Sequence, residues 1–285
     1  MRFLSLGSGS RGNATLLQSG ENVLLVDCGF SLRELTRRLA MAGLGIEDID
    51  ALLLTHEHSD HIRGAQSLSR QHGVPVWGSA GTLRACSWHE GSELHQINAN
   101  ASDFRIGGIR VTPFTVPHDA AEPCQFFFSD LKHRFGILTD TGSVTAHIVS
   151  RLQGLDALLL EFNHDLRMLH NGPYPPSLQR RVGGSHGHLN NAQSAGLIGQ
   201  LDHHNWKHLV AAHISEKAKL VKLADKISNL RDMAVCPPSG WPLERRQEYF
   251  DWARAVIDRL RGVHPSLEAI FDEAYARRPQ HGDCE

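Results

Sequence analysis

Three histidines and one aspartate lie within six residues directly after an apolar run. Residues 49–55 read as a buried strand, which leads into His56, His58, Asp60 and His61. Two histidines two positions apart in an extended chain point the same way, so His56 and His58 can hold one metal ion. Asp60 and His61 turn into the next predicted helix, where they can hold a second ion close by. Imidazole and carboxylate ligands without thiolate suit Zn²⁺, Mn²⁺ or Fe.

Histidine is unusually abundant in this chain. The 285 residues include 19 histidines, and 17 of these lie in residues 1–218. Because histidine is the commonest metal ligand, this distribution places the expected chemistry in the first part of the chain. The five cysteines are odd in number, widely spaced and free of a CxxC pair, which argues against a disulfide framework and a cysteine zinc site.

Charge and hydropathy exclude several classes of partner. The formal net charge is −2, so no whole-molecule field attracts nucleic acid or an anionic membrane, and such a partner must meet a local patch. No apolar run approaches the roughly 20 residues that span a bilayer. The first residues carry too short an apolar core for a signal peptide. The expected compartment is the cytoplasm.

Short strands and helices must position these residues. Apolar runs predict strands at 74–77, 109–116, 125–128, 135–139, 155–161 and 208–212. Helical spacing predicts helices at 62–72, 144–153 and 190–202. This mixture predicts sheets layered with helices on the outside. Residues 1–30 read as two strands around a glycine-rich turn at 7–13, and residues 163–190 read as a long polar loop that is a candidate for function.

The composition changes near residue 218. Residues 219–285 read as helices throughout, with apolar stripes at helical spacing and a break at 237–240. About 65 amphipathic residues form a marginal core alone. We therefore expect two parts, residues 1–217 and a helical appendage at 218–285.

The motif in residues 55–61, Thr-His-Glu-His-Ser-Asp-His, resembles the signature of the metallo-β-lactamase superfamily, in particular its nuclease and phosphodiesterase branches. Segments 7–13, 160–165, 171–175 and 187–191 resemble the YycJ/WalJ-type subfamily, bacterial cytoplasmic proteins regarded as DNA exonucleases. The resemblance covers roughly residues 1–217. It implies an α/β fold, the αββα sandwich, with two divalent metal ions, Zn or Mn.

The same resemblance implies a ligand set, because further acids and histidines follow in the family's order. One ion would be held by His56, His58 and His118. The second ion would be held by Asp60, His61 and His213. Asp140 would bridge the two ions, and Asp27 would orient ligands from behind. His164 also follows an apolar run and competes with His213 for the second ion.

The implied activity is hydrolysis of DNA phosphodiesters, as in a 5′–3′ exodeoxyribonuclease. A metal-bound hydroxide would attack phosphorus, with Asp60 among the catalytic residues. His164 or His188 would protonate the leaving alkoxide. Arg180 and Arg181 lie in the predicted loop, where they form either a solvated charge pair or a clamp for a substrate phosphate.

Two alternatives stay open. The same centre polarises a carbonyl equally well, so a small-molecule hydrolase of thioesters or cyclic phosphodiesters would have the same metal ligands. The appendage resembles the last helices of SpoT-type HD-domain alarmone hydrolases, in segments 219–232 and 240–252. Asp225 matches a metal ligand of that family, but the family's histidine and His-Asp partners have no match in the appendage. The appendage therefore resembles an HD-domain fragment, and a fusion protein with impaired catalysis is the second alternative.

Overall fold

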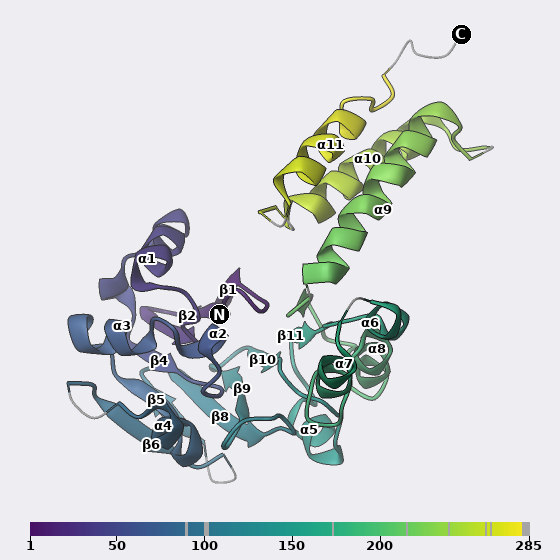
Figure 1. The fold of residues 1–285 in the computed structure, drawn as a ribbon. Coiled ribbons are helices and arrows are strands. Elements are labelled where there is room, and N and C mark those ends of the chain that lie inside the picture. Colours follow the sequence, from purple (N-terminus) through teal and green to yellow (C-terminus); the bar gives the residue numbers. More distant parts are fainter. Residues whose placement is uncertain are drawn as a thin grey trace. The chain divides into compact units, whose positions relative to one another are not determined.

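The computed structural model describes residues 1–88, 91–99, 103–172, 174–214, 216–238, 240–259, 261–262 and 264–280. The chain forms two compact units, Met1–Ile214 and Ser215–Glu285. The first unit is built on two six-stranded sheets with helices outside them, and the second unit is helical (Figure 1). The division expected between residues 217 and 218 falls in the first turn of the helix that opens the second unit.

The first sheet joins strands from the N-terminal part of the first unit. Its order is β1-β2-β3-β4-β5-β6, antiparallel from β1 to β3 and parallel from β3 to β6. The strands are β1 (Arg2–Gly7), β2 (Ala14–Ser19), β3 (Asn22–Val26), β4 (Ala51–Leu53), β5 (Val76–Ser79) and β6 (Leu94–Ile97). The two strands predicted in residues 1–30 are present as β1 and β3, but the prediction missed β2, which lies between them. Its polar residues Thr15 and Gln18 interrupt the apolar run that marks a buried strand.

The second sheet follows in the chain. Its order is β12-β11-β10-β9-β8-β7, parallel from β12 to β10 and antiparallel from β10 to β7. The strands are β7 (Phe104–Ile106), β8 (Ile109–Thr115), β9 (Cys124–Ser129), β10 (Arg134–Leu138), β11 (Ala157–Glu161) and β12 (His208–Ala212). The strands predicted from residue 109 onward are confirmed, each within two residues at either end.

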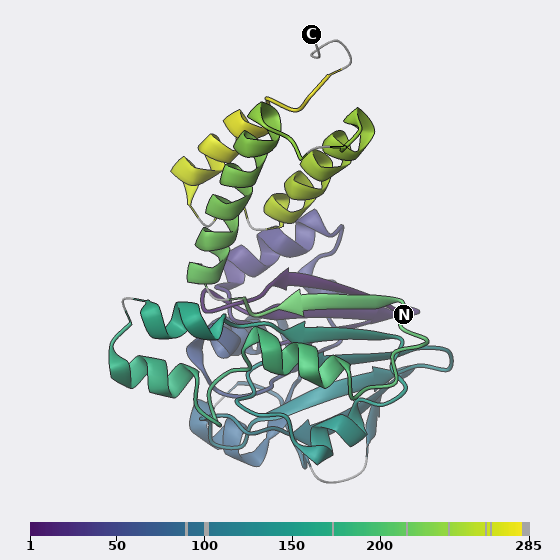
Figure 2. The same cartoon turned by 90° about the vertical axis from the view of Figure 1, so that its right-hand side faces the viewer.

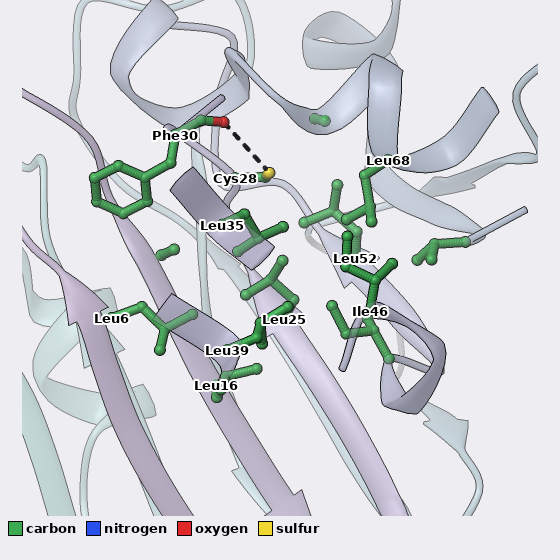
Figure 3. Packing of buried hydrophobic residues seen from close by; sticks show 14 of the residues in the cluster. Leu6, Leu16, Leu25, Cys28, Phe30, Leu35, Leu39, Ile46, Leu52 and Leu68 are labelled. Atoms are coloured by element: carbon green, nitrogen blue, oxygen red, sulfur yellow. Dashed lines mark hydrogen bonds between the residues drawn. The ribbon is translucent and has the colours of Figure 1, made fainter. Parts of the chain in front are cut away.

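Alternate side chains of the buried strands enter different cores, which explains why these strands read as continuous apolar runs. On β11, Leu159 lies in the cluster between the two sheets, whereas Leu158 and Leu160 pack in an outer cluster. On β3, Leu25 packs with residues of α1 (Leu32–Met41) in the other outer cluster (Figure 3). The layers are helix, sheet, sheet and helix, so the αββα prediction is confirmed.

Helices cover the outer faces of both sheets. Residues of α1 and α3 (Ala65–His72) pack in the outer cluster of the first sheet, and residues of α5 (Ala146–Arg151) and α8 (Asn191–Ile198) pack in that of the second. The shorter helices are a 3₁₀ turn (Ile46–Asp48), α2 (Ser59–Ile62), α4 (Ala80–Cys86), α6 (Leu166–Asn171) and α7 (Pro176–Val182). The prediction of a loop over residues 163–190 was wrong in part, because α6 and α7 lie there. Helices of six or seven residues are too short to show an amphipathic period.

Several strands end together at one edge of the sandwich. In the first sheet β3 and β4 are parallel, and in the second sheet β10, β11 and β12 are parallel. Strand β8 shares the direction of β10, because β9 runs antiparallel to both. In Figure 2 the strands of the first unit run side by side. The carboxyl ends of parallel strands are where open α/β sheets place ligand sites.

The second unit contains three amphipathic helices, α9 (Glu216–Val235), α10 (Leu243–Asp258) and α11 (Pro265–Tyr275). Its apolar cluster includes Leu230, Phe250 and Phe271. The sequence prediction of helices after residue 218 is confirmed for the described residues. Across the described residues of both units, the structure contains no helix with the length and apolar character to cross a membrane.

Candidate metal centre

The predicted metal ligands lie in loops at the carboxyl ends of the strands. Asp27 follows β3, His56 to His61 follow β4, His118 follows β8, Asp140 follows β10 and His213 follows β12. Within the described residues four groups have ligand atoms within 4.8 Å of one another: His56–His58–His118, His56–His61–Asp140, Asp60–His61–His213 and Asp140–Glu161–His188–His213.

Three of these residues have left-handed backbone conformations. The φ angles are 60° at Asp27, 52° at Asp140 and 51° at His213. Positive φ is uncommon for residues other than glycine and persists where the surrounding structure enforces it. Each residue lies one or two positions after the end of a strand. The left-handed turn at that residue directs its side chain into the cluster.

The first histidine group brings three ring nitrogens together. His56 Nε2 lies 3.0 Å from His58 Nδ1, and His118 Nε2 lies 3.3 Å from the same atom. His56 and His118 are buried, and His58 is partly exposed. The geometry of three converging nitrogens at a partly open position fits one metal ion.

The other ring nitrogens of this group contact protein oxygens. His118 Nδ1 lies 3.0 Å from the carbonyl oxygen of Gly187, and His58 Nε2 lies 3.2 Å from that of Asp119. A ring nitrogen that faces a carbonyl must carry the proton and donate it. Each inner nitrogen therefore keeps its lone pair for a metal ion.

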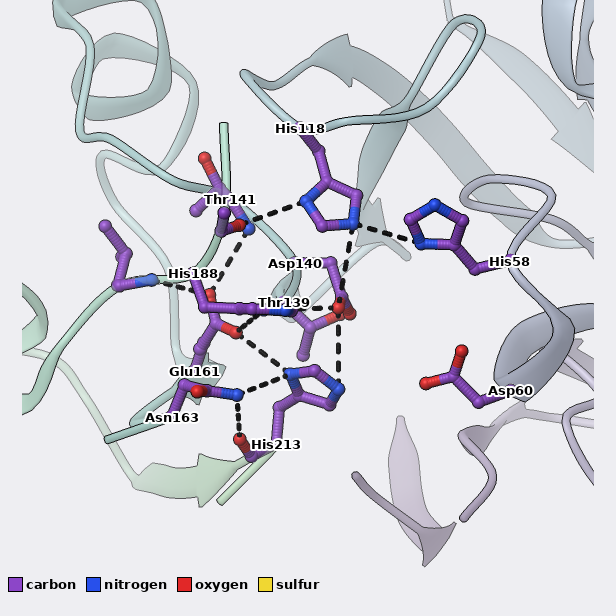
Figure 4. A network of polar contacts seen from close by, with 12 residues as sticks. His58, Asp60, His118, Thr139, Asp140, Thr141, Glu161, Asn163, His188 and His213 are labelled. Atoms are coloured by element: carbon purple, nitrogen blue, oxygen red, sulfur yellow. Dashed lines mark hydrogen bonds and ion pairs between the residues drawn. The ribbon is translucent and has the colours of Figure 1, made fainter. Parts of the chain in front are cut away.

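Asp140 lies between the two proposed groups (Figure 4). Its carboxylate oxygens lie 3.4 Å from His61 Nε2, 3.4 Å from His213 Nε2 and 4.0 Å from His118 Nε2. His61 Nε2 also lies 3.6 Å from Asp60 Oδ2. One carboxylate thus faces histidines of both groups, which is the position of a bridging ligand.

Asp27 supports the second group from behind. Its Oδ2 lies 2.8 Å from His61 Nδ1, which fixes His61 Nε2 as the inner nitrogen. The backbone N–H of Thr55 donates to Asp27 Oδ1 at 2.9 Å, and the Thr55 hydroxyl donates to Oδ2 at 2.8 Å. The side chain of Asp27 is held in one orientation and is a positioning group.

Glu161 is a functional candidate that the sequence analysis missed. This buried carboxylate lies 2.8 Å from His188 Nδ1 and 2.9 Å from His213 Nδ1, and it accepts backbone N–H bonds from Thr141 and Leu189. It therefore orients His213 as Asp27 orients His61. The signal was present in the sequence, because Glu161, like Asp27, is an acid at the end of an apolar strand.

Asn13 was also missed, although its motif was recognised. Its Nδ2 lies 3.2 Å from Asp60 Oδ2 and 2.9 Å from His61 Nε2. The backbone N–H of Gly9 donates to Asn13 Oδ1 at 2.7 Å, which sets the orientation of the amide. The glycine-rich turn at 7–13 thus contacts the candidate metal ligands through Asn13 and also through Ser8, whose Oγ accepts the backbone N–H of His213 at 2.6 Å.

Opposing pKa shifts follow from burial and from the acids. Burial lowers the pKa of His56 and of His118. Burial acts the same way on His61 and His188, but nearby acids outweigh it: Asp140 and Asp27 raise the pKa of His61 to about 9, and Glu161 raises that of His188 to about 9. Without a metal ion, His61 and His188 therefore keep their protons to higher pH than His56 and His118 do.

Two buried atoms in the cluster lack a hydrogen-bond partner among the described residues. They are Asp140 Oδ2 and His213 Nε2. Unsatisfied buried polar atoms are rare in native structures and require an explanation. Both atoms face the proposed second ion position, and the surrounding donors are imidazole and carboxylate groups. The residues present therefore fit divalent metal ions such as Zn²⁺ or Mn²⁺.

Three predicted site residues, one histidine and two arginines, are not among these candidate ligands. His164 is buried after β11 and its Nδ1 lies 3.1 Å from Asn163 Oδ1, but it belongs to none of the four groups. His213, its competitor, belongs to two of them. Arg180 is exposed on α7, whereas the neighbouring Arg181 forms an ion pair with Asp119.

The comparisons with known proteins concern mainly the first unit. Residues 22–214 match the family model described as the beta-lactamase superfamily domain. Exodeoxyribonuclease YycJ of Bacillus anthracis is 34% identical over 227 residues, which are 79% of this chain and 86% of that protein. The crystal structure of the metallo-β-lactamase fold protein YhfI from Bacillus subtilis superimposes with a TM-score of 0.58 at 19% identity, over 75% of this chain and 85% of that one.

The remainder of the chain matches a different protein. Guanosine-3′,5′-bis(diphosphate) 3′-pyrophosphohydrolase MESH1 of Drosophila melanogaster is 53% identical over 68 residues. This match covers 24% of the chain and 38% of that protein. Both resemblances expected from the sequence are thereby confirmed, and the second is confirmed as a partial one.

Proposed function

The chain belongs to the β-lactamase superfamily, and from this premise we propose that it is a binuclear metal-dependent phosphodiesterase that degrades DNA as an exonuclease. The position of Asp140 between two ligand groups carries the binuclear part of the proposal. The similarity to an exodeoxyribonuclease over four fifths of the chain supports DNA as substrate.

The first ion would be held by His56, His58 and His118. The second would be held by Asp60, His61 and His213, with Asp140 shared. When bound, such ions polarise phosphoryl oxygens and lower the pKa of a coordinated water to about 7.

His188 is the proposed proton donor to the leaving alkoxide. Its Nδ1 is held by Glu161 at 2.8 Å, and its side chain is partly exposed. With Nδ1 bonded to a carboxylate, the ring has a fixed orientation and Nε2 is the nitrogen available to substrate. His164 is the weaker candidate, because its Nε2 is buried and the residue lies outside the cluster.

We also propose that residues 1–217 form the hydrolase domain and that residues 218–285 form an appendage without its own active site. The appendage covers only the part of MESH1-like proteins that the 68-residue match represents. Asp225 is exposed on α9 and pairs with Lys226, a contact that needs no metal ion.

Degradation of labelled DNA in the presence of Mn²⁺ tests this function. The purified chain should release mononucleotides, and variant Asp60→Asn should lose at least about a hundredfold in rate because a proposed ligand is gone. Variant Asp202→Asn makes the same change at an exposed residue after α8 and should keep the parent rate. Strands with and without a 5′-phosphate, labelled at either end, report the polarity.

Equal rates for Asp60→Asn and the parent would contradict the proposal. So would a parent protein that binds metal and leaves DNA intact, and in that case thioesters and cyclic phosphodiesters are the substrates to examine next.

A further inference from the structure

We propose that Asp119 and Arg181 form a phosphate-docking pair beside the metal centre. In this pair Asp119 positions the guanidinium of Arg181 for a backbone phosphate of the DNA strand. The inference rests on the proposed function, because it states how the same site would hold that substrate. Asp119 has no role in the ligand set described above.

The contacts of Arg181 leave it open to an anion. Its Nε donates to Asp119 Oδ2, and its side chain is 62% exposed. Among the residues that the structure describes, this bond engages Nε, so the terminal N–H groups can still donate. An arginine held in this way presents a planar pair of donors, which matches the geometry of a phosphate.

Asp119 connects this arginine to the metal ligands. Its carbonyl oxygen lies 3.2 Å from His58 Nε2, and its Oδ1 lies 3.5 Å from His118 Nε2. Asp119 therefore contacts His58 through its backbone carbonyl, whereas its carboxylate contacts both His118 and Arg181. A phosphate on Arg181 would lie on the His56–His58–His118 side of the centre.

The helix that carries Arg181 is fixed to the site at its end. The backbone N–H of His188 donates to the carbonyl of Val182 at 2.9 Å, and the next loop is bonded by Ser143 Oγ to Ser185 O at 3.2 Å. A Cβ atom added to Gly187 would overlap the carbonyl oxygens of Arg181 and Val182. Because α7 packs this closely on the segment of His188, Arg181 has a defined place relative to the cluster.

Arg180 provides the internal contrast. It is the preceding residue on the same short helix, carries the same charge and is exposed. A rotation of about 100° per residue directs adjacent helical side chains differently. The sequence treats the two arginines alike, whereas the structure links only Arg181 to the proposed metal ligands within the described residues.

Local charge is the reason that such a pair matters in this protein. The chain has a formal net charge of −2, so a DNA strand must be attracted by particular side chains. Phosphate contacts by arginine release counterions, which makes DNA affinity fall with salt in proportion to the number of contacts. The slope of log Kd against log salt therefore measures the number of phosphate contacts, including the one that Arg181 would make.

Binding of single-stranded DNA to the full chain in EDTA separates docking from catalysis. Variant Arg181→Ala should raise the Kd about tenfold, and the slope of log Kd against log salt should fall by about 0.7, the value for one phosphate contact of a single strand. Variant Arg180→Ala, which removes the same charge one residue away, should change the Kd less than twofold.

Variant Asp119→Asn tests the positioning role. It keeps the backbone carbonyl that contacts His58, and it retains the Arg181 side chain and its charge while removing the ion pair that orients it, so metal content and the salt slope should match the parent. The kcat of the Mn²⁺-loaded protein should fall about tenfold, because the strand is held out of register with the centre. A merely structural role would instead lower metal content and thermal stability together.

The outcomes are distinct. Equal effects of Arg180→Ala and Arg181→Ala, or no effect of either, would overturn the docking pair. A parental kcat for Asp119→Asn would overturn the role of Asp119. Failure of the proposed function gives a different result, because the parent itself would then leave DNA intact in Mn²⁺.

Discussion

Buried carboxylates organise the candidate centre at the scale of single residues. Asp27 bonds the outer nitrogen of His61, and Glu161 bonds the outer nitrogen of His213. The two acids come from different sheets, and each one fixes the orientation of a candidate metal-binding histidine. Fixing the tautomer of a ligand raises its affinity for metal, and loss of such a partner typically costs 10- to 100-fold.

Variant Glu161→Gln is expected to lower the affinity for Mn²⁺ or Zn²⁺ by about 10- to 100-fold. The amide retains the shape of the side chain, but its negative charge no longer stabilises His213 and His188. Isothermal titration of the metal-free protein measures the change. Variant Glu21→Gln, in the exposed turn between β2 and β3, is the matched control and should bind as the parent does. Unchanged affinity in Glu161→Gln would contradict the role given to this residue.

His213 and His164 make a second matched pair. Both are buried histidines that follow strands of the second sheet, but only His213 belongs to the groups of candidate ligands. Variant His213→Ala should retain one metal ion per chain after dialysis, whereas variant His164→Ala should retain two. Mass spectrometry of the bound metals decides between them, and the reverse result would make His164 the ligand.

The site residues differ in how far the sequence alone predicts them. His56, His58, Asp60 and His61 lie within six residues of the chain, so their spacing alone indicates a shared metal site. Asn13 acts through contacts with residues far away in the sequence, and no local pattern marks such contacts. Arg180 and Arg181 are indistinguishable in sequence because helix phase and the position of Asp119 decide which one faces the site.

Backbone packing between loops sets the geometry at the scale of elements. The N–H of Asn13 donates to the carbonyl of Asp60, and the N–H of Cys28 donates to the carbonyl of His61. The turn after β1, the loop after β3 and α2 are thereby bonded to one another. Gly29 lies at their junction, where a Cβ atom would overlap the carbonyl of Asp60.

Variant Gly29→Ala is expected to lower the free energy of unfolding by about 1–3 kcal/mol, the usual cost of overpacking, and to weaken metal binding. Variant Gly196→Ala adds the same methyl group in α8, where nothing lies within 4 Å of the new atom. It should raise stability by up to about 1 kcal/mol, because alanine is the better helix former. Urea unfolding compares the two, and equal effects would mean that the junction around Gly29 is looser than described.

The sequence predicts best those strands that are buried on both faces, because nearly all their side chains are apolar. Strands such as β11 enter two cores and read as unbroken apolar runs. Strand β2 carries polar residues and was missed, although it pairs along its whole length with β1 and β3. Helices α6 and α7 were missed because they are too short to show an apolar stripe; α6 begins after the capping side chain of Asp165, and α7 begins with a proline.

The whole molecule consists of two units with separate cores. The clusters of the first unit contain residues up to Ala212, and the cluster of the second begins at Leu223. The candidate metal ligands all belong to the first unit. A ligand stabilises only the unit whose native state binds it.

Calorimetry of the full chain is therefore expected to show two unfolding transitions, of which only one responds to metal. Saturating Mn²⁺ should raise the Tm of the transition of the first unit, and EDTA should reverse the shift. The transition of the small helical unit should stay in place. A shift of both transitions by the same amount would contradict independent units.

Anomalous diffraction from crystals grown with Mn²⁺ tests the binuclear centre most directly. We expect two peaks, one among His56, His58 and His118, and the other among Asp60, His61 and His213. The Asp140 carboxylate should lie between them. A single peak, or peaks that avoid this cluster, would contradict the assignment of a two-metal centre to this chain.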